Sequence, residues 1–132
     1  MEQVKKVLII DDEPQTTKYF STLLEDNGFI AHCANNADEG MGQIQALNPD
    51  LILLDLMMPS RSGIILFNKI KRDARYRDIP IIIVTGIQTE LPGDHKAFFN
   101  GLKLHKPSAY LEKPVDPERL IETVTRTLAC SN

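Results

Sequence analysis

Three apolar runs of the chain end in residues whose side-chain oxygens could bind a cation or a phosphate group. Carboxylates follow the first two runs, a threonine follows the third, and a weaker apolar segment leads into a lysine. In chain order these residues are Asp11 and Asp12 with Glu13, then Asp55, Thr85 and Lys113.

Carboxylates gathered at one place need a positive partner. Two of them about 4 Å apart repel by roughly 4 kcal/mol at an effective dielectric near 20, so either one takes up a proton or a hard cation binds. Oxygen ligands with room for water suit Mg²⁺, and a cation held in this way also accepts phosphate oxygens. A lysine can neutralise a phosphate oxygen and a threonine hydroxyl can donate to one. The residue types therefore indicate phosphoryl chemistry.

The apolar runs themselves predict strands. Residues 7–10, 51–54 and 81–84 do not alternate with polar residues, which is typical of strands buried on both faces. Weaker candidates are 29–33 and 109–111.

Helical patterns lie between these strands. Pro14 suits a first helical turn, Asn36 with Glu39 resembles a capping box, and Asp116 with Pro117 predicts the start of a last helix. The expected inward-facing residues are Tyr19, Phe20, Leu23 and Leu24, then Met41, Ile44 and Leu47, then Ile64, Phe67 and Ile70, and finally Leu120, Ile121, Val124 and Leu128.

Alternating strands and helices predict an α/β fold with right-handed crossovers and a parallel sheet. Five strands and about five helices fit one doubly wound domain of this length. In such folds ligands bind outside the carboxyl ends of the strands, where the polar residues named above stand.

Composition excludes several classes of function. The 132 residues carry a net charge of -3, which argues against direct binding of nucleic acid by this chain. Two cysteines, Cys33 and Cys130, without close spacing predict reduced thiols in a cytoplasmic protein rather than a disulfide framework or a zinc site. The longest apolar runs are too short to cross a membrane.

At this point the chain resembles the receiver domain of two-component response regulators, the CheY-like family. The matching segments are VLIIDDEP (7–14), LILLDLMMPSRSG (51–63), IIIVTG (81–86) and YLEKP (110–114), and the resemblance covers residues 4–129 as a single domain. It implies a flavodoxin-like, CheY-like five-stranded sheet in the order 2-1-3-4-5.

The resemblance also implies roles for individual residues. Asp55 would accept a phosphoryl group from a histidine kinase or histidine phosphotransfer protein, in a step that depends on Mg²⁺. The chain would be a switch and not a turnover enzyme. The ligands of Mg²⁺ would be Asp11, Asp12, Asp55 and the backbone carbonyl of Met57. Thr85 and Lys113 would bind phosphoryl oxygens, and Thr85 and Tyr110 would change position on activation. The residues that shape the site would be Pro59, Gly63, Gly86 and Pro114, the last of which would follow a cis peptide bond.

Other interpretations stay open from the residues alone. The acids after the first strand could be a solvated strand end with a helix-capping acid, and Tyr110 could be an ordinary core or edge residue. A phosphatase of the haloacid-dehalogenase type also uses an aspartate nucleophile with Mg²⁺, although it wants two aspartates two positions apart, where this chain has Asp11 and Glu13. A degenerate receiver that only binds partners is a third possibility. The presence of Asp12, Asp55, Thr85 and Lys113 argues against it.

One departure from the family pattern and one pair of apolar residues lead to further expectations. The interval from Thr85 to Lys113 is 28 residues (113 minus 85), longer than is usual in receivers. We therefore expect an irregular region of the fourth helix, with a short or displaced helix at 95–104, within the 86–129 region through which a homodimer or an output domain would be contacted. Met57 and Ile87, two residues after Asp55 and Thr85, are apolar and predict a long-lived phosphoryl group.

Overall fold

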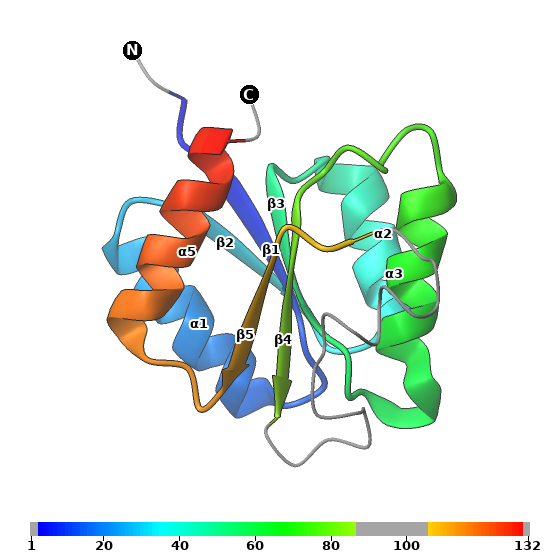
Figure 1. Ribbon diagram of the computed structural model, residues 1–132, viewed down its shortest axis with the longest axis horizontal. Coiled ribbons are helices and arrows are strands. Elements are labelled where there is room, and N and C mark those ends of the chain that lie inside the picture. Colours follow the sequence, from blue (N-terminus) through cyan, green and yellow to red (C-terminus); the bar gives the residue numbers. More distant parts are fainter. Residues whose placement is uncertain (1–2, 87–105, 131–132) are drawn as a thin grey trace.

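The chain folds around a parallel sheet whose strands are ordered β2-β1-β3-β4-β5 (Figure 1). This computed structural model describes residues 3–86 and 106–130. The elements in chain order are β1 Lys6–Ile10, α1 Pro14–Asp26, β2 Ile30–Ala34, α2 Ala37–Leu47, β3 Leu51–Asp55, a 3-10 turn Pro59–Arg61, α3 Ser62–Arg72, β4 Ile81–Gly86, β5 Ala109–Lys113 and α5 Pro117–Cys130. The predicted fold class and strand order are confirmed.

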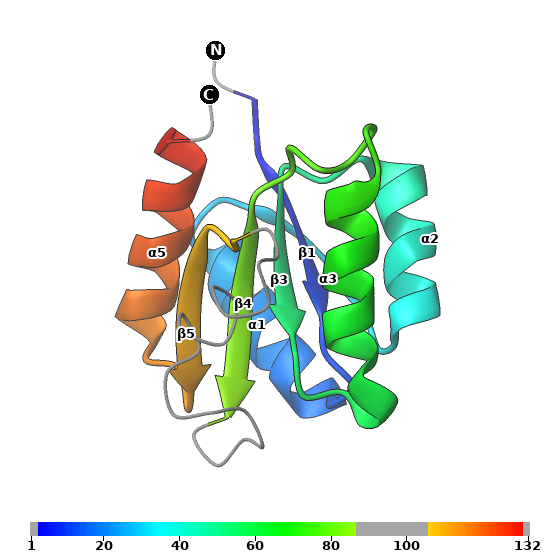
Figure 2. The same cartoon turned by 45° about the vertical axis from the view of Figure 1, so that its right-hand side comes forward.

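Helices cover both faces of the sheet, with α1 and α5 on one side and α2 and α3 on the other (Figure 2). Each side has its own apolar core. Phe20 and Leu24 of α1 pack on the first side, and Ile44 of α2 with Phe67 and Ile70 of α3 pack on the second. The central strand β3 is buried along its whole length, including its last residue.

Local signals explain where the helices begin and end. Asn36 caps α2 by accepting a hydrogen bond from the backbone N–H of Glu39 at 2.8 Å, as the capping-box pattern predicts. Gly28, whose φ is +90°, follows the end of α1 in the left-handed region that glycine adopts without cost. Asp116 accepts from the backbone N–H of Arg119 at the start of α5.

Several details differ from the sequence-based expectation. The second strand begins at Ile30 and not at Phe29, because the N–H of Phe29 still bonds to Leu24 at the end of α1. Tyr19 is 42% exposed, so it lies outside the inward face of its helix. On α5, Thr123 and Thr127 are buried while Ile121 and Leu128 are only half-buried, which shifts the inward stripe of that helix toward its threonines.

The expected displaced helix at 95–104 lies outside the described residues. Within the described part of the chain, no helix has the length and apolar character needed to cross a membrane.

The residue that ends α2 generates a first prediction. Asn48 has φ 47° and ψ 64°, and its backbone N–H bonds to the carbonyl of Ile44 at 2.9 Å. Because a β-carbon is unfavourable in this conformation and asparagine tolerates it best among non-glycine residues, Asn48→Ala should lower the free energy of unfolding by about 1 kcal/mol. Asn48→Gly should be neutral or stabilising in the same urea titration, and an alanine variant as stable as the glycine variant would contradict this account.

Candidate functional site

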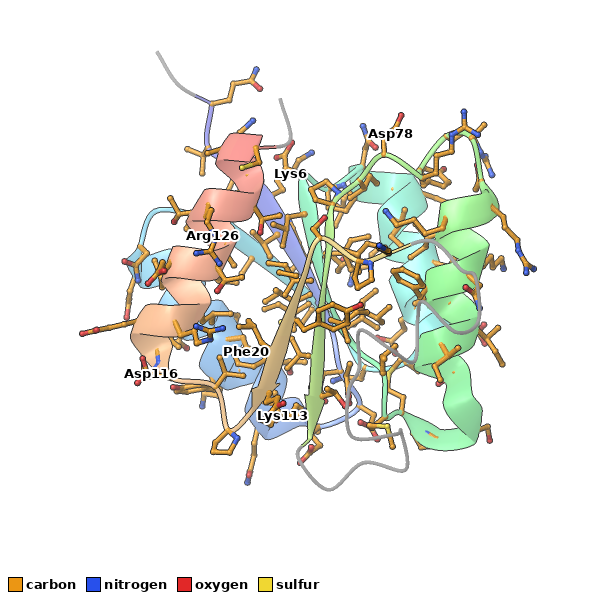
Figure 3. The ribbon with its side chains drawn as sticks, in the orientation of Figure 1. Lys6, Phe20, Asp78, Lys113, Asp116 and Arg126 are labelled. Carbon is orange, nitrogen blue, oxygen red and sulfur yellow. The ribbon has the colours of Figure 1, made fainter. Side chains whose placement is uncertain are left out.

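The carboxyl ends of the strands bring the polar residues predicted from the sequence to one edge of the sheet. β3 lies between β1 and β4, with Ile10 paired to Leu54 and Asp55 paired to Val84, and Gly86 at the end of β4 pairs with Lys113. The arrowheads of β4 and β5 point to the same end of the molecule, where Figure 3 places Lys113.

Three carboxylates meet at this edge. Asp11 and Asp55 are 1% and 4% exposed, whereas Asp12 is exposed, and one oxygen from each lies within 4.8 Å of the others. Two buried like charges and a third beside them are unfavourable unless a positive group faces them. An all-oxygen set open to solvent on one side fits a hard divalent cation such as Mg²⁺.

Lys113 supplies one positive charge from β5. Its Nζ lies 2.8 Å from Asp11 Oδ2, 3.6 Å from Asp55 Oδ2 and 3.5 Å from Glu13 Oε1. Burial works to lower the pKa of this ammonium, but the hydrogen bond to Asp11 and the neighbouring carboxylates outweigh it, so the pKa lies above its ordinary value. The Lys113–Pro114 peptide bond is cis, as the resemblance leads one to expect.

The carboxylate of Asp55 lies farther from Lys113 than that of Asp11 does. The pKa of Asp55 is raised to about 6, chiefly by burial and also by the charges of Asp11 and Asp12. The backbone N–H of Met57, which donates to Oδ1 at 2.9 Å, and the charge of Lys113 oppose this rise. Lys113 is too far from Asp55 to compensate fully. The carboxylate of Asp55, the last residue of β3, is therefore buried, and nearby positive charge compensates its own charge only in part.

Thr85 stands beside this cluster at the end of β4. Its side chain is completely buried, and Oγ1 has no hydrogen-bond partner among the described residues. A buried hydroxyl left unpaired costs about 1–3 kcal/mol, so natural proteins rarely keep one without a use for it. Its position suggests a hydroxyl available to a bound ligand.

The loop after Asp55 is shaped by small and restricted residues. A β-carbon added to Gly63 would collide with the carbonyl oxygen of Asp55 and with the backbone of Leu56, so only glycine lets the start of α3 pack against this turn. Pro59 begins the 3-10 turn, and Ser60 follows with φ 59°. The loop thus depends on backbone conformations that few residues adopt.

Gly86 and Tyr110 were also expected to take part in the site. Among the residues that the structure describes, none has an atom within 4 Å of a β-carbon added to Gly86, its chain neighbours aside. Tyr110 is half-buried and packs against the core on the α2 and α3 side.

Two contacts of the site were missed by the sequence reasoning. The ion pair between Glu13 and Lys113 joins residues 100 positions apart (113 minus 13), and spacing carries no signal for it. Asn35 donates from Nδ2 to the carbonyl oxygen of Asp11 at 3.1 Å. Its place directly before the capping residue Asn36 put it near the strand ends, but nothing in its type alone distinguished it.

Comparison with known proteins gives concordant matches. A family model of the response regulator receiver domain matches residues 7–125. The chain is 32% identical over 120 residues to the phosphate regulon transcriptional regulatory protein PhoB of Escherichia coli (strain K12), covering 91% of this chain and 50% of PhoB. It is 32% identical over 124 residues to protein PilH of Pseudomonas aeruginosa, covering 94% of this chain and 98% of PilH. The chain thus spans about half the length of PhoB and nearly all of PilH.

Solved structures agree with this. A response regulator receiver domain protein (CheY-like) from Methanospirillum hungatei JF-1 superposes with a TM-score of 0.82 at 26% identity, over 98% of this chain and 97% of that one. The chemotaxis response regulator CheY4 of Vibrio cholerae superposes with a TM-score of 0.80 at 26% identity, over 95% of this chain and 99% of that one.

The raised pKa of Asp55 predicts a pH-dependent cost to stability in metal-free protein. The folded state holds the Asp55 proton more tightly than the unfolded chain, so stability falls as pH rises from about 4 through about 6, and the full cost is present above that window. In EDTA at about pH 7.5, Asp55→Asn should raise the free energy of unfolding by about 1–3 kcal/mol, and the gain should shrink at about pH 5.

Urea titrations at both pH values measure this effect. Glu112→Gln removes an exposed carboxylate from the same end of the sheet and serves as the control, with a change below about 0.5 kcal/mol expected at either pH. An Asp55→Asn protein no more stable than the wild type at the higher pH would show that the ionised carboxylate is not strained.

Proposed function

The chain belongs to the response regulator receiver domain family of two-component systems, and from that premise we propose that it is a phosphorylation-controlled switch whose acceptor is Asp55. One observation carries this proposal above the others. Asp55 is a buried carboxylate with a raised pKa, and it lies close to Lys113 and to two further acids.

The proposed cofactor is Mg²⁺. Asp11, Asp12, Asp55 and the backbone carbonyl of Met57 would hold it, and the mutual proximity of the three carboxylates supports this assignment. When bound, the ion would neutralise charge on the carboxylates and on the phosphoryl oxygens.

The proposed reaction is a phosphoryl transfer from a phosphohistidine of a histidine kinase or phosphotransfer protein. An oxygen of Asp55 attacks phosphorus, a P–O bond forms, the P–N bond breaks, and the released imidazole nitrogen takes up a proton. Lys113 Nζ lies close enough to Asp55 to pair with one phosphoryl oxygen. The hydroxyl of Thr85, which has no hydrogen-bond partner among the residues described, would donate to another phosphoryl oxygen.

The proposed output uses the β4–β5 side of the sheet. Thr85 and Tyr110 lie on neighbouring strands, whose pairing sets Ile83 opposite Tyr110 and Thr85 opposite Glu112. Recruitment of the Thr85 hydroxyl by the phosphoryl group would pull on β4 and so reach Tyr110 and the 86–129 surface. A second copy of the chain or an output domain would bind there, and PhoB, which is about twice as long as the matched region, is a relative described as a transcriptional regulator.

The alternative phosphatase is not favoured. Its second acid would be Glu13, whose carboxylate is largely exposed and paired with Lys113. The degenerate alternative is opposed by the grouping of Asp12, Asp55, Thr85 and Lys113 at one edge.

Labelling with acetyl phosphate tests the proposal. In MgCl₂ the purified chain should gain the mass of a single phosphoryl group by intact-protein mass spectrometry, and EDTA should abolish the gain because the acids then stay mutually repulsive. Asp55→Asn should remain unlabelled, whereas Asp26→Asn, an exposed aspartate at the end of α1, should be labelled as the wild type is. Label that persists in Asp55→Asn would overturn the assignment.

The lifetime of the phosphoryl group is a separate prediction. Met57 is 37% exposed two residues after Asp55, and its side chain cannot orient an attacking water by hydrogen bonding. After removal of the phosphodonor we expect a half-life of minutes or longer, and a shorter one in Met57→Asn, whose amide can hold a water.

Loss of label with time measures this lifetime. Ile65→Asn makes the same kind of change at an exposed site on α3 and should leave the half-life unaltered. A half-life of seconds in the wild type would refute the prediction.

A further inference from the structure

The turn between β2 and α2 carries a side chain that reaches the acidic end of β1. Asn35 Nδ2 donates a hydrogen bond to the carbonyl oxygen of Asp11 at 3.1 Å, across 24 positions of sequence. That carbonyl belongs to the peptide unit that joins Asp11 to Asp12. The bond therefore connects the turn to the backbone between two of the three clustered carboxylates.

The two acids are held in different ways. The backbone N–H of Asp11 bonds to the carbonyl of Ala34 at 3.1 Å, and its carboxylate accepts from the N–H of Glu13 and from Lys113. Asp12 is exposed, and within the described chain its carboxylate accepts no hydrogen bond and forms no ion pair. Its location is therefore set by the backbone that carries it, and the Asn35 bond constrains that backbone.

Asn35 is itself fixed by the start of α2. Its backbone N–H donates to Glu39 Oε1 at 3.2 Å, and Glu39 Oε2 accepts from Asn36 Nδ2 at 3.2 Å. The backbone N–H of Glu39 in turn donates to Asn36 Oδ1 at 2.8 Å. The donor thus projects from a capped helix start and not from a free loop, so it can hold the Asp11 carbonyl in place.

The approach to Asp12 passes beside this side chain. Asp12 and Asn35 line one surface groove together with Met58 and Pro59 of the loop after β3. Asn35 therefore lies beside Asp12 at the surface and is also bonded to the backbone that precedes Asp12.

We propose that Asn35 is a positioning residue that sets the affinity of this site for Mg²⁺, by holding the Asp11–Asp12 peptide so that the Asp12 carboxylate faces the cation. The inference rests on the proposed Mg²⁺ site. Loss of a residue that orients a ligand typically weakens metal binding about 10–100-fold, and since Asn35 is exposed we expect a loss of about 3–10-fold.

Calorimetric titration of the purified chain with MgCl₂ tests the proposal without any phosphoryl transfer. Asn35→Ala should raise the Kd for Mg²⁺ about 3–10-fold. Its melting temperature in EDTA should stay close to that of the wild type, because an exposed side chain with a single hydrogen bond contributes about 1 kcal/mol or less.

Asn27→Ala is the matched control. Asn27 is also exposed, and its Nδ2 also donates to a backbone carbonyl, that of Leu23 at 2.8 Å, but at the far end of α1. This variant should bind Mg²⁺ as tightly as the wild type.

The outcomes separate this inference from the function on which it rests. Wild-type protein that binds no Mg²⁺ overturns both. Wild-type binding with an unchanged Kd in Asn35→Ala overturns the role of Asn35 alone, as does an equal loss in Asn27→Ala, because the effect would then be general loosening.

Discussion

Repulsion among carboxylates at the end of β1 and β3 is the constraint around which this end of the molecule is arranged. Asp11 and Asp55 are almost fully buried, and Lys113 Nζ lies 2.8 Å from the carboxylate of the first and 3.6 Å from that of the second. Two such charges about 4 Å apart repel by several kcal/mol even at an effective dielectric near 20. The lysine compensates Asp11 well and Asp55 poorly, so the residual strain falls on one carboxylate.

The sheet order makes this arrangement possible. With β3 between β1 and β4, the ends of β1, β3, β4 and β5 lie in succession along one edge. The acids come from the first two of these strands, the hydroxyl from the third and the lysine from the fourth. The start of α3 packs closely against the end of β3 at Gly63, where an added β-carbon would collide with the carbonyl oxygen of Asp55.

The sequence predicted the parts of this structure that depend on strong local signals. Unbroken apolar runs identified β1, β3 and β4, and the Asn36–Glu39 pattern identified the start of α2. The edge strand β2 and the inward face of α5 were predicted less well, because half-buried strands and buried threonines carry no periodic apolar signal. The Asn35 bond to Asp11 was missed for another reason: it joins a side chain to a backbone atom, and residue types do not report on backbone acceptors.

Incomplete interactions distinguish this site from an ordinary buried ion cluster. An ion pair that served stability alone would leave no unpaired group. Within the described part of the chain, however, the buried hydroxyl of Thr85 has no hydrogen-bond partner, and the pKa of Asp55 is raised. Each deficit has the sign that a bound cation or phosphoryl group would correct, since the first needs an acceptor and the second needs positive charge. A ligand that accepts a hydrogen bond from Thr85 and brings positive charge to Asp55 would therefore bind more favourably than one that does neither. Because Thr85 lies on β4, which pairs with β5, a shift of Thr85 toward such a ligand would act on the two strands that also carry Tyr110.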